Sequence, residues 1–86
     1  MTTFNGNDKD LASILISAER YALGRSTYIV SWTCDIIKNN LQCLSENDIN
    51  VLIHDIENAT NYGMYIDEEQ WMDLKDKLKD LLNGGN

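Results

Sequence analysis

Apolar residues recur at helical spacing in four segments of the chain, and short polar or glycine-containing links separate these segments. Apolar positions three and four residues apart place one face of a helix toward a core. Short links between helices are typical of bundles, so the pattern predicts an all-α fold: one compact four-helix domain, an antiparallel bundle or an orthogonal variant. The chain is predicted to form a single domain, residues 1–86, with a disordered start at about residues 1–6. The predicted helices lie at about residues 8–23, 27–41, 46–61 and 68–83.

The first, third and fourth helices each have a well-defined apolar face, and we expect that face to be buried. The predicted buried residues are Leu11, Ile14, Leu15, Ala18, Tyr21 and Ala22 in the first helix, Ile49, Leu52, Ile53, Ile56 and Ala59 in the third, and Trp71, Leu74, Leu78, Leu81 and Leu82 in the fourth.

The second helix is apolar on more than one side, with Tyr28, Val30, Trp32 and Ile37 among its apolar residues. A helix of this kind is usually central and covered by several neighbours. In a chain of 86 residues few neighbours exist. Part of this surface is therefore also a candidate self-association face.

Residues with special backbone roles mark the helix ends. Gly24 fits the position just past a helix, where a positive φ favours glycine, and Ser26 or Thr27 can cap the next helix. Ser45 and Asp48 form a variant of the capping box at the start of the third helix.

A second capping box is predicted at the start of the fourth helix. Asp67 takes the cap position and Gln70 the reciprocal one, while Ile66 packs onto Trp71. Gly84 and Gly85 end this helix.

The corner around Gly24 combines groups that bind anions. Arginines, hydroxyl groups and free backbone N–H groups at a helix start together suit a phosphate or a carboxylate. The candidate ligand-binding residues are Arg20, Arg25, Ser26, Thr27 and Tyr28. In the structural alternative the tyrosines pack, and Arg20 pairs with a nearby acid. The acids within reach are Glu19, Asp35 and Asp55.

The net charge of −7 lies in the second half of the chain, where residues 45–86 hold ten acidic residues and three lysines. An acidic face of this kind disfavours nucleic-acid phosphates and favours a basic protein surface. The alternative is that the negative charge serves ordinary solubility. The candidate partner-binding residues are Asp67, Glu68, Glu69, Asp73, Asp76 and Asp80.

The sequence lacks the usual patterns of catalysis and metal binding. It contains no glycine-rich phosphate loop, and Cys34, Cys43 and a single histidine, His54, do not make a metal site. We predict no enzymatic activity, no metal and no cofactor, and we expect Cys34 to be a core residue and His54 a surface residue. Unpaired cysteines and the lack of an export signal or an apolar span predict a cytoplasmic protein that does not enter a membrane.

The corner Tyr21-Ala22-Leu23-Gly24-Arg25-Ser26-Thr27-Tyr28, followed by Asp35 and by Ile53-His54-Asp55-Ile56-Glu57, resembles small phage and prophage accessory proteins of Gram-positive hosts. The resemblance implies that the protein acts in the cytoplasm of a host cell. Small acidic phage proteins often act by binding a host protein, and inhibitors of host defence are among them.

Three functional hypotheses follow. The first is a non-enzymatic interaction protein that binds a host protein through its acidic second half or its aromatic corner. The second is a binder or sponge of a small phosphorylated ligand at Arg20 and Arg25. The third is a structural homo-oligomer that associates through the second helix.

Overall fold

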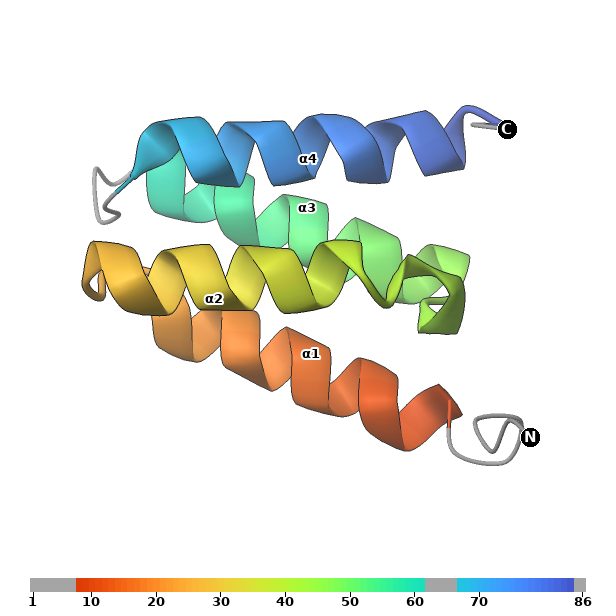
Figure 1. Cartoon of the computed structure of the whole chain (residues 1–86). Helices are drawn as coiled ribbons and strands as arrows, with labels where there is room; N and C mark the ends of the chain where they lie inside the picture. The colour runs from red at the N-terminus through yellow and green to blue at the C-terminus, as the bar shows by residue number, and fades with distance from the viewer. Residues whose placement is uncertain (1–7, 62–66, 85–86) are drawn as a thin grey trace.

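The protein folds into four α-helices joined by short connections (Figure 1). The structure is a computed structural model and describes residues 8–61 and 67–84, among which there is no β-strand. The predicted all-α four-helix domain is confirmed. Its elements are α1 (Asp8–Ala22), α2 (Thr27–Lys38), the 3₁₀-helix η1 (Leu41–Cys43), α3 (Glu46–Asn61) and α4 (Glu68–Leu82).

Helices that follow one another in the chain run in opposite directions (Figure 1). α1 packs against α2, and α3 packs against α4. The two pairs join where α2 contacts α4 and where α1 contacts α3. Each helix therefore has two main neighbours and keeps an outer side free of the other helices.

The second helix is shorter than predicted, because it ends at Lys38 rather than near Leu41. Asn40 donates a hydrogen bond from Nδ2 to the carbonyl oxygen of Ile36 at 2.7 Å, and its backbone N–H bonds to Ile37. An asparagine side chain that bonds to the preceding turn competes with helical backbone bonds, and this ends the helix. The chain then forms η1.

The core lies between the four helices and centres on Trp71, Leu74 and Leu78 of α4, which are completely buried. The predicted face of α3 is confirmed, since all five of its residues are buried. The predicted face of α4 is confirmed for these three residues, whereas Leu82 is half-buried and Leu81 is exposed. Cys34 is buried and His54 is exposed, as expected.

The prediction for α1 was partly wrong, because Ile14 and Tyr21 are exposed. The helix turns a different set of positions inward, and this set includes a carboxylate, Glu19. The inward residues follow a heptad spacing of three and four residues, the spacing of a helix that packs along a narrow seam. They are Ala12, Leu15, Glu19 and Ala22.

The prediction for α2 was also partly wrong. Val30, Thr33, Cys34 and Ile37 are buried, but the described residues leave Tyr28 and Trp32 exposed. α2 contacts α1 and α4, so its outer side has no helix to cover it.

Side-chain capping occurs at one of the three predicted helix starts. The Ser45 hydroxyl accepts the Asp48 N–H at 3.1 Å, and the Asp48 carboxylate accepts the Ser45 N–H at 3.0 Å, which confirms the capping box. Ser26 and Asp67 do occupy cap positions, but neither side chain makes a capping hydrogen bond. Asp67 has a left-handed backbone, with a φ of 64°, so its carboxylate does not reach the first turn as the box requires. The predicted packing of Ile66 lies outside the described residues.

We predict that Ser45→Ala lowers the free energy of unfolding by about 1 kcal/mol, because it removes a side-chain cap. Ser26→Ala is the matched control, since that serine also precedes a helix but makes no capping bond. Urea denaturation followed by circular dichroism measures both. If the two variants lose the same free energy of unfolding, the capping box does not stabilise α3.

Candidate functional site

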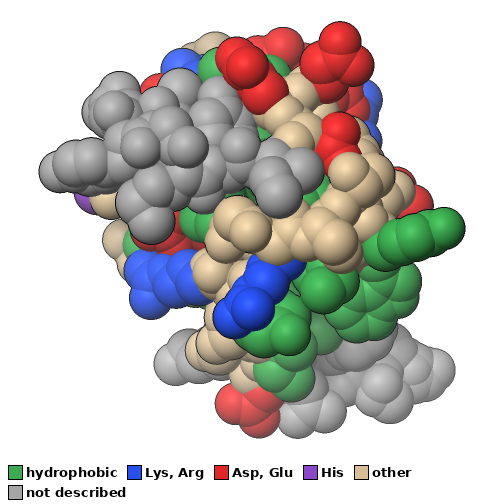
Figure 2. All heavy atoms as spheres, turned by 90° about the vertical axis from the view of Figure 1, so that its left-hand side faces the viewer, with side chains coloured by type: hydrophobic (Ala, Val, Ile, Leu, Met, Phe, Trp, Pro, Cys, Tyr) green, Lys and Arg blue, Asp and Glu red, His purple; other side chains and the backbone are tan. Residues whose placement is uncertain are grey.

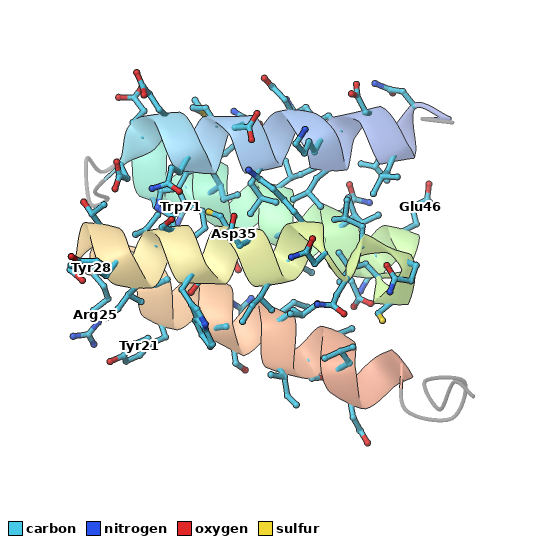
Figure 3. All side chains as sticks on the ribbon, viewed as in Figure 1. Tyr21, Arg25, Tyr28, Asp35, Glu46 and Trp71 are labelled. Atoms are coloured by element: carbon cyan, nitrogen blue, oxygen red, sulfur yellow. The ribbon has the colours of Figure 1, made fainter. Side chains whose placement is uncertain are left out.

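The corner between α1 and α2 is a tight chain reversal. Gly24 has a φ of 84°, in the left-handed region that glycine tolerates, and the Arg25 N–H bonds to the Ala22 carbonyl at 2.9 Å. The predicted break at Gly24 is confirmed. It places two helices and their terminal side chains at one end of the bundle (Figure 3).

Arg20 points to α3. Its Nε donates to Asp55 Oδ2 at 2.8 Å, and this hydrogen-bonded ion pair raises the pKa of the guanidinium. Among the acids proposed for Arg20 in the structural alternative, Asp55 is the partner. The pair ties the end of α1 to α3.

Arg25 folds back on α1 instead. Its Nε donates to the Tyr21 carbonyl at 3.2 Å, and its guanidinium carbon lies 4.5 Å from the centre of the Tyr21 ring. This is the geometry of a cation–π interaction. Within residues 10–59 and 67–84, no carboxylate pairs with Arg25. The two arginines of the predicted ligand site therefore have different partners.

The other predicted ligand-binding residues, Ser26, Thr27 and Tyr28, are all exposed. Ser26 makes no capping bond, and the first turn of α2 carries no acidic residue. Figure 3 shows Tyr21, Arg25 and Tyr28 together at this end of the molecule. The structure thus brings Arg25 and Tyr28 together, while the side chain of Arg20 is held by α3.

Four of the predicted partner-binding residues form one line along the outer side of α4, which we call the acidic stripe: Glu69, Asp73, Asp76 and Asp80. They are spaced by four, three and four residues, so they share one helical face, and all four are exposed. Figure 2 shows acidic side chains gathered at the top of the molecule, where α4 lies.

The remaining two predicted residues lie off the acidic stripe. Glu68 is exposed. Asp67 is half-buried, and its Oδ2 is buried without a hydrogen-bond partner in the described part of the chain.

Two of the three lysines of α4 turn away from the acidic stripe, whereas the exposed Lys77 lies one helical turn from Asp73 and partly offsets the charge there. Lys75 and Lys79 point to Glu57 of α3, with N–O distances of 3.7 Å and 3.4 Å. Within the stripe, Asp73 pairs with Lys38 of α2 at 2.6 Å, and this hydrogen bond lowers the pKa of Asp73. Asp76 and Asp80 have no ion pair with a described residue.

Glu19 is an ionisable core residue that the sequence pattern did not reveal. It is completely buried, and no described residue donates a hydrogen bond to either carboxyl oxygen. The pKa of Glu19 is raised to about 10, mainly by burial and also by a hydrogen bond to Asp55 and the negative charge of Asp55, while Arg20 opposes this shift. The side chain is therefore a neutral acid at neutral pH. The sequence did contain one indication of this burial, because Glu19 is spaced four residues after Leu15 and three before Ala22, on the same face of the helix.

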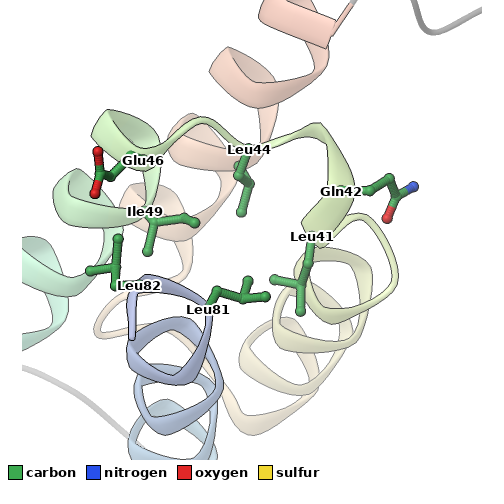
Figure 4. Close-up of a pocket in the computed structure, with 7 residues that line it drawn as sticks. All are labelled: Leu41, Gln42, Leu44, Glu46, Ile49, Leu81 and Leu82. Atoms are coloured by element: carbon green, nitrogen blue, oxygen red, sulfur yellow. The ribbon is translucent and has the colours of Figure 1, made fainter. Parts of the chain in front are cut away.

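A pocket of about 300 Å³ opens at the other end of the bundle (Figure 4). Its lining is mainly aliphatic, and Glu46 is the one ionisable residue in it. A single carboxylate offers no pair for acid–base or nucleophilic chemistry. The lining residues are Leu41, Gln42, Leu44, Glu46, Ile49, Leu81 and Leu82.

The described residues include a buried cysteine with a raised pKa and no group placed to bind a metal ion. Burial raises the pKa of the Cys34 thiol to about 12, so this cysteine stays protonated and unreactive. No group of three or more metal-ligating side chains within the described residues is placed to hold a metal ion. Within the same residues, no helix has the length and apolar character needed to cross a membrane.

Comparison of the chain with protein-family models, with curated proteins and with solved structures finds no match. The function is therefore inferred from the geometry of the chain's own residues.

The buried carboxyl group predicts a pH-dependent stability. Because the pKa of Glu19 is about 10 in the folded state and about 4.5 when the chain is unfolded, its contribution is most favourable below pH 4.5 and declines as the pH rises toward 10. As the pH rises from 4 to 7, the wild type should lose on the order of 3 kcal/mol in its free energy of unfolding relative to Glu19→Gln.

Urea denaturation of both proteins at several pH values measures this gain. Asp10→Asn is the control, because it removes a carboxylate from the same helix at an exposed position. If the free energies of unfolding of Glu19→Gln and the wild type differ by the same amount at every pH, Glu19 is not buried in its neutral form.

Proposed function

We propose that this protein is a small, acidic, non-enzymatic interaction protein that binds a basic surface of a host protein through the acidic stripe of α4. The observation that carries the proposal is the alignment of Glu69, Asp73, Asp76 and Asp80 on the outer side of one helix. Aligned charges of one sign steer an oppositely charged partner and fix its orientation.

The ion pairs around α4 support this use of the stripe. A stripe whose carboxylates all paired with lysines of its own helix would present little net charge. Here Lys75 and Lys79 turn to Glu57, so that they bind α4 to α3 and leave Asp76 and Asp80 unpaired among the described residues. The arrangement stabilises the bundle and leaves a negative surface exposed.

The resemblance of the α1–α2 corner to small phage and prophage proteins suggests the biological setting. In that setting the partner is a protein of the host cell, and inhibition of a host defence system is the corresponding role. A defence protein that binds nucleic acid would present the basic surface that the acidic stripe needs, because phosphate contacts require lysine and arginine.

A phosphorylated small molecule at the corner is the second candidate. It is supported by the uncapped start of α2 and by Arg25, which has no acidic partner among the described residues. Because Asp55 holds Arg20, a ligand would depend mainly on Arg25. Calorimetry with a panel of nucleotides tests this, with heat expected from the wild type and none from Arg25→Ala.

We predict that immobilised wild-type protein captures a basic protein from a host lysate and that the captured protein elutes at high salt. Reversal of two stripe charges, in Asp76→Lys/Asp80→Lys, should weaken binding of the purified partner by about tenfold or more. Both positions are exposed and without ion pairs to described residues, so the variant is expected to fold.

Asp10→Lys/Glu46→Lys is the matched control. It changes the net charge by the same amount, but its exposed positions lie on α1 and α3. Retained binding by the control and lost binding by the stripe variant supports the proposal. Equal affinities for the two variants would rule out the acidic stripe as the binding surface.

A further inference from the structure

The outer side of α1 and α2 carries an unusual set of exposed apolar side chains, which we call the aromatic face: Ile14, Tyr21, Tyr28 and Trp32. The exposed fractions are 61% for Ile14, 57% for Tyr21, 88% for Tyr28 and 62% for Trp32. Figure 2 shows hydrophobic side chains over α2 and α1 in the lower part of the view, below the acidic side chains of α4. Tyrosine, tryptophan and arginine are the residues that most often dominate binding at protein interfaces.

The aromatic face is large for a chain of this size. A whole aromatic side chain covers about 150–250 Å², so the exposed parts of Tyr21, Tyr28 and Trp32 amount to roughly 300–500 Å². Ile14 adds to this area. The largest apolar patch on a typical monomer is about 300–600 Å², and a standard interface buries about 800 Å² on each partner. The face supplies the apolar centre of such an interface.

The two aromatic residues on α2 are placed symmetrically about the outward point of the helix. Val30 is completely buried, so the point on α2 opposite Val30 faces outward. Tyr28 and Trp32 lie two residues before and after Val30. At about 100° and 1.5 Å per residue, these two positions lie on either side of that outward point, about 3 Å before and after it along the helix, so an antiparallel second copy can place Trp32 opposite Tyr28.

One cation and one anion flank the two aromatic residues along the chain. Arg25 lies two residues before α2 begins at Thr27, and Asp35 lies within α2, five residues or about 7.5 Å beyond Val30 along the helix. Asp35 is exposed, and neither Asp35 nor Arg25 forms an ion pair with a described residue. In Figure 3, Arg25 lies at the start of α2 and Asp35 lies farther along it.

We infer that the protein forms a homodimer in which α2 packs antiparallel against α2 of a second copy, around a two-fold axis level with Val30. In this arrangement Tyr28 packs on Trp32 of the second copy, and Arg25 pairs with Asp35 of the second copy. A two-fold interface uses the same surface on both chains, so each contact occurs twice. The inference does not depend on the proposed binding of a host protein.

The charge distribution favours a second copy as the occupant of this face. The first half of the chain, which contains α1 and α2, holds four acidic and four basic residues, so it has no excess of negative charge. Two copies can therefore meet there without the repulsion that contact through the acidic stripes would cause. The guanidinium of Arg25 uses Nε for the Tyr21 carbonyl, so its terminal amino groups are available to a second carboxylate.

Sedimentation velocity of the purified protein between about 1 µM and about 1 mM tests the dimer, because small interfaces dissociate in this range. We expect a concentration-dependent monomer–dimer equilibrium. Trp32→Ala should raise the dissociation constant by roughly thirty-fold or more, the effect of losing an interface hot spot. Leu81→Ala is the control, since it removes an exposed apolar side chain from α4 and should leave the dimer unchanged.

Charge exchange tests the register. Arg25→Glu and Asp35→Arg alone should each weaken the dimer by roughly tenfold, and the double variant should restore it, because the pair then forms with reversed charges. Thermal melts establish that each variant folds. A wild-type monomer throughout the range overturns the inference, as does a dimer that tolerates Trp32→Ala. Failure of the double variant to restore the dimer overturns the antiparallel register.

Discussion

The chain reversal at Gly24 is the constraint on which the arrangement of the other surfaces depends. Its positive φ ends α1 and lets α2 begin within a few residues, so the two helices lie side by side and antiparallel. This reversal also separates the two arginines. Arg20 belongs to the last turn of α1 and reaches Asp55 on α3, whereas Arg25 lies beyond the break and stacks on Tyr21. One glycine therefore decides which cation stabilises the bundle and which stays on the surface.

Glu19 shows that the core is not optimised for stability alone. A buried carboxyl group that receives no hydrogen bond from a described residue costs free energy, and its neutral form costs less than its ionised form. The neighbouring Asp55 favours the neutral form further, because a protonated Glu19 can donate a hydrogen bond to Asp55, whereas an ionised Glu19 would be repelled by it. A small domain has only a few kcal/mol of stability to lose. The four helices and their largely aliphatic core must therefore offset this group.

The sequence predicted the fold well and the surfaces less well, for physical reasons. Helical periodicity and the capping box at Ser45 depend on local interactions, so both could be predicted without the tertiary structure. The direction that each helix faces depends on its neighbours. Two positions on α1, Ile14 and Tyr21, fit the apolar pattern, yet packing against α2 and α3 turned Glu19 inward instead. At Asp67, a left-handed backbone replaced the expected side-chain cap, and composition alone does not predict such a conformation.

The two candidate surfaces are compatible because they lie on different helices and differ in character. The acidic stripe on α4 repels another acidic stripe, whereas the aromatic face on α1 and α2 belongs to the half of the chain that has no excess of negative charge. Association through the aromatic face leaves one acidic stripe exposed on each copy. Two linked binding surfaces raise the apparent affinity for a partner that presents two basic sites, because the second contact becomes intramolecular. A weak single interaction between carboxylates and a basic surface would then be sufficient for stable binding.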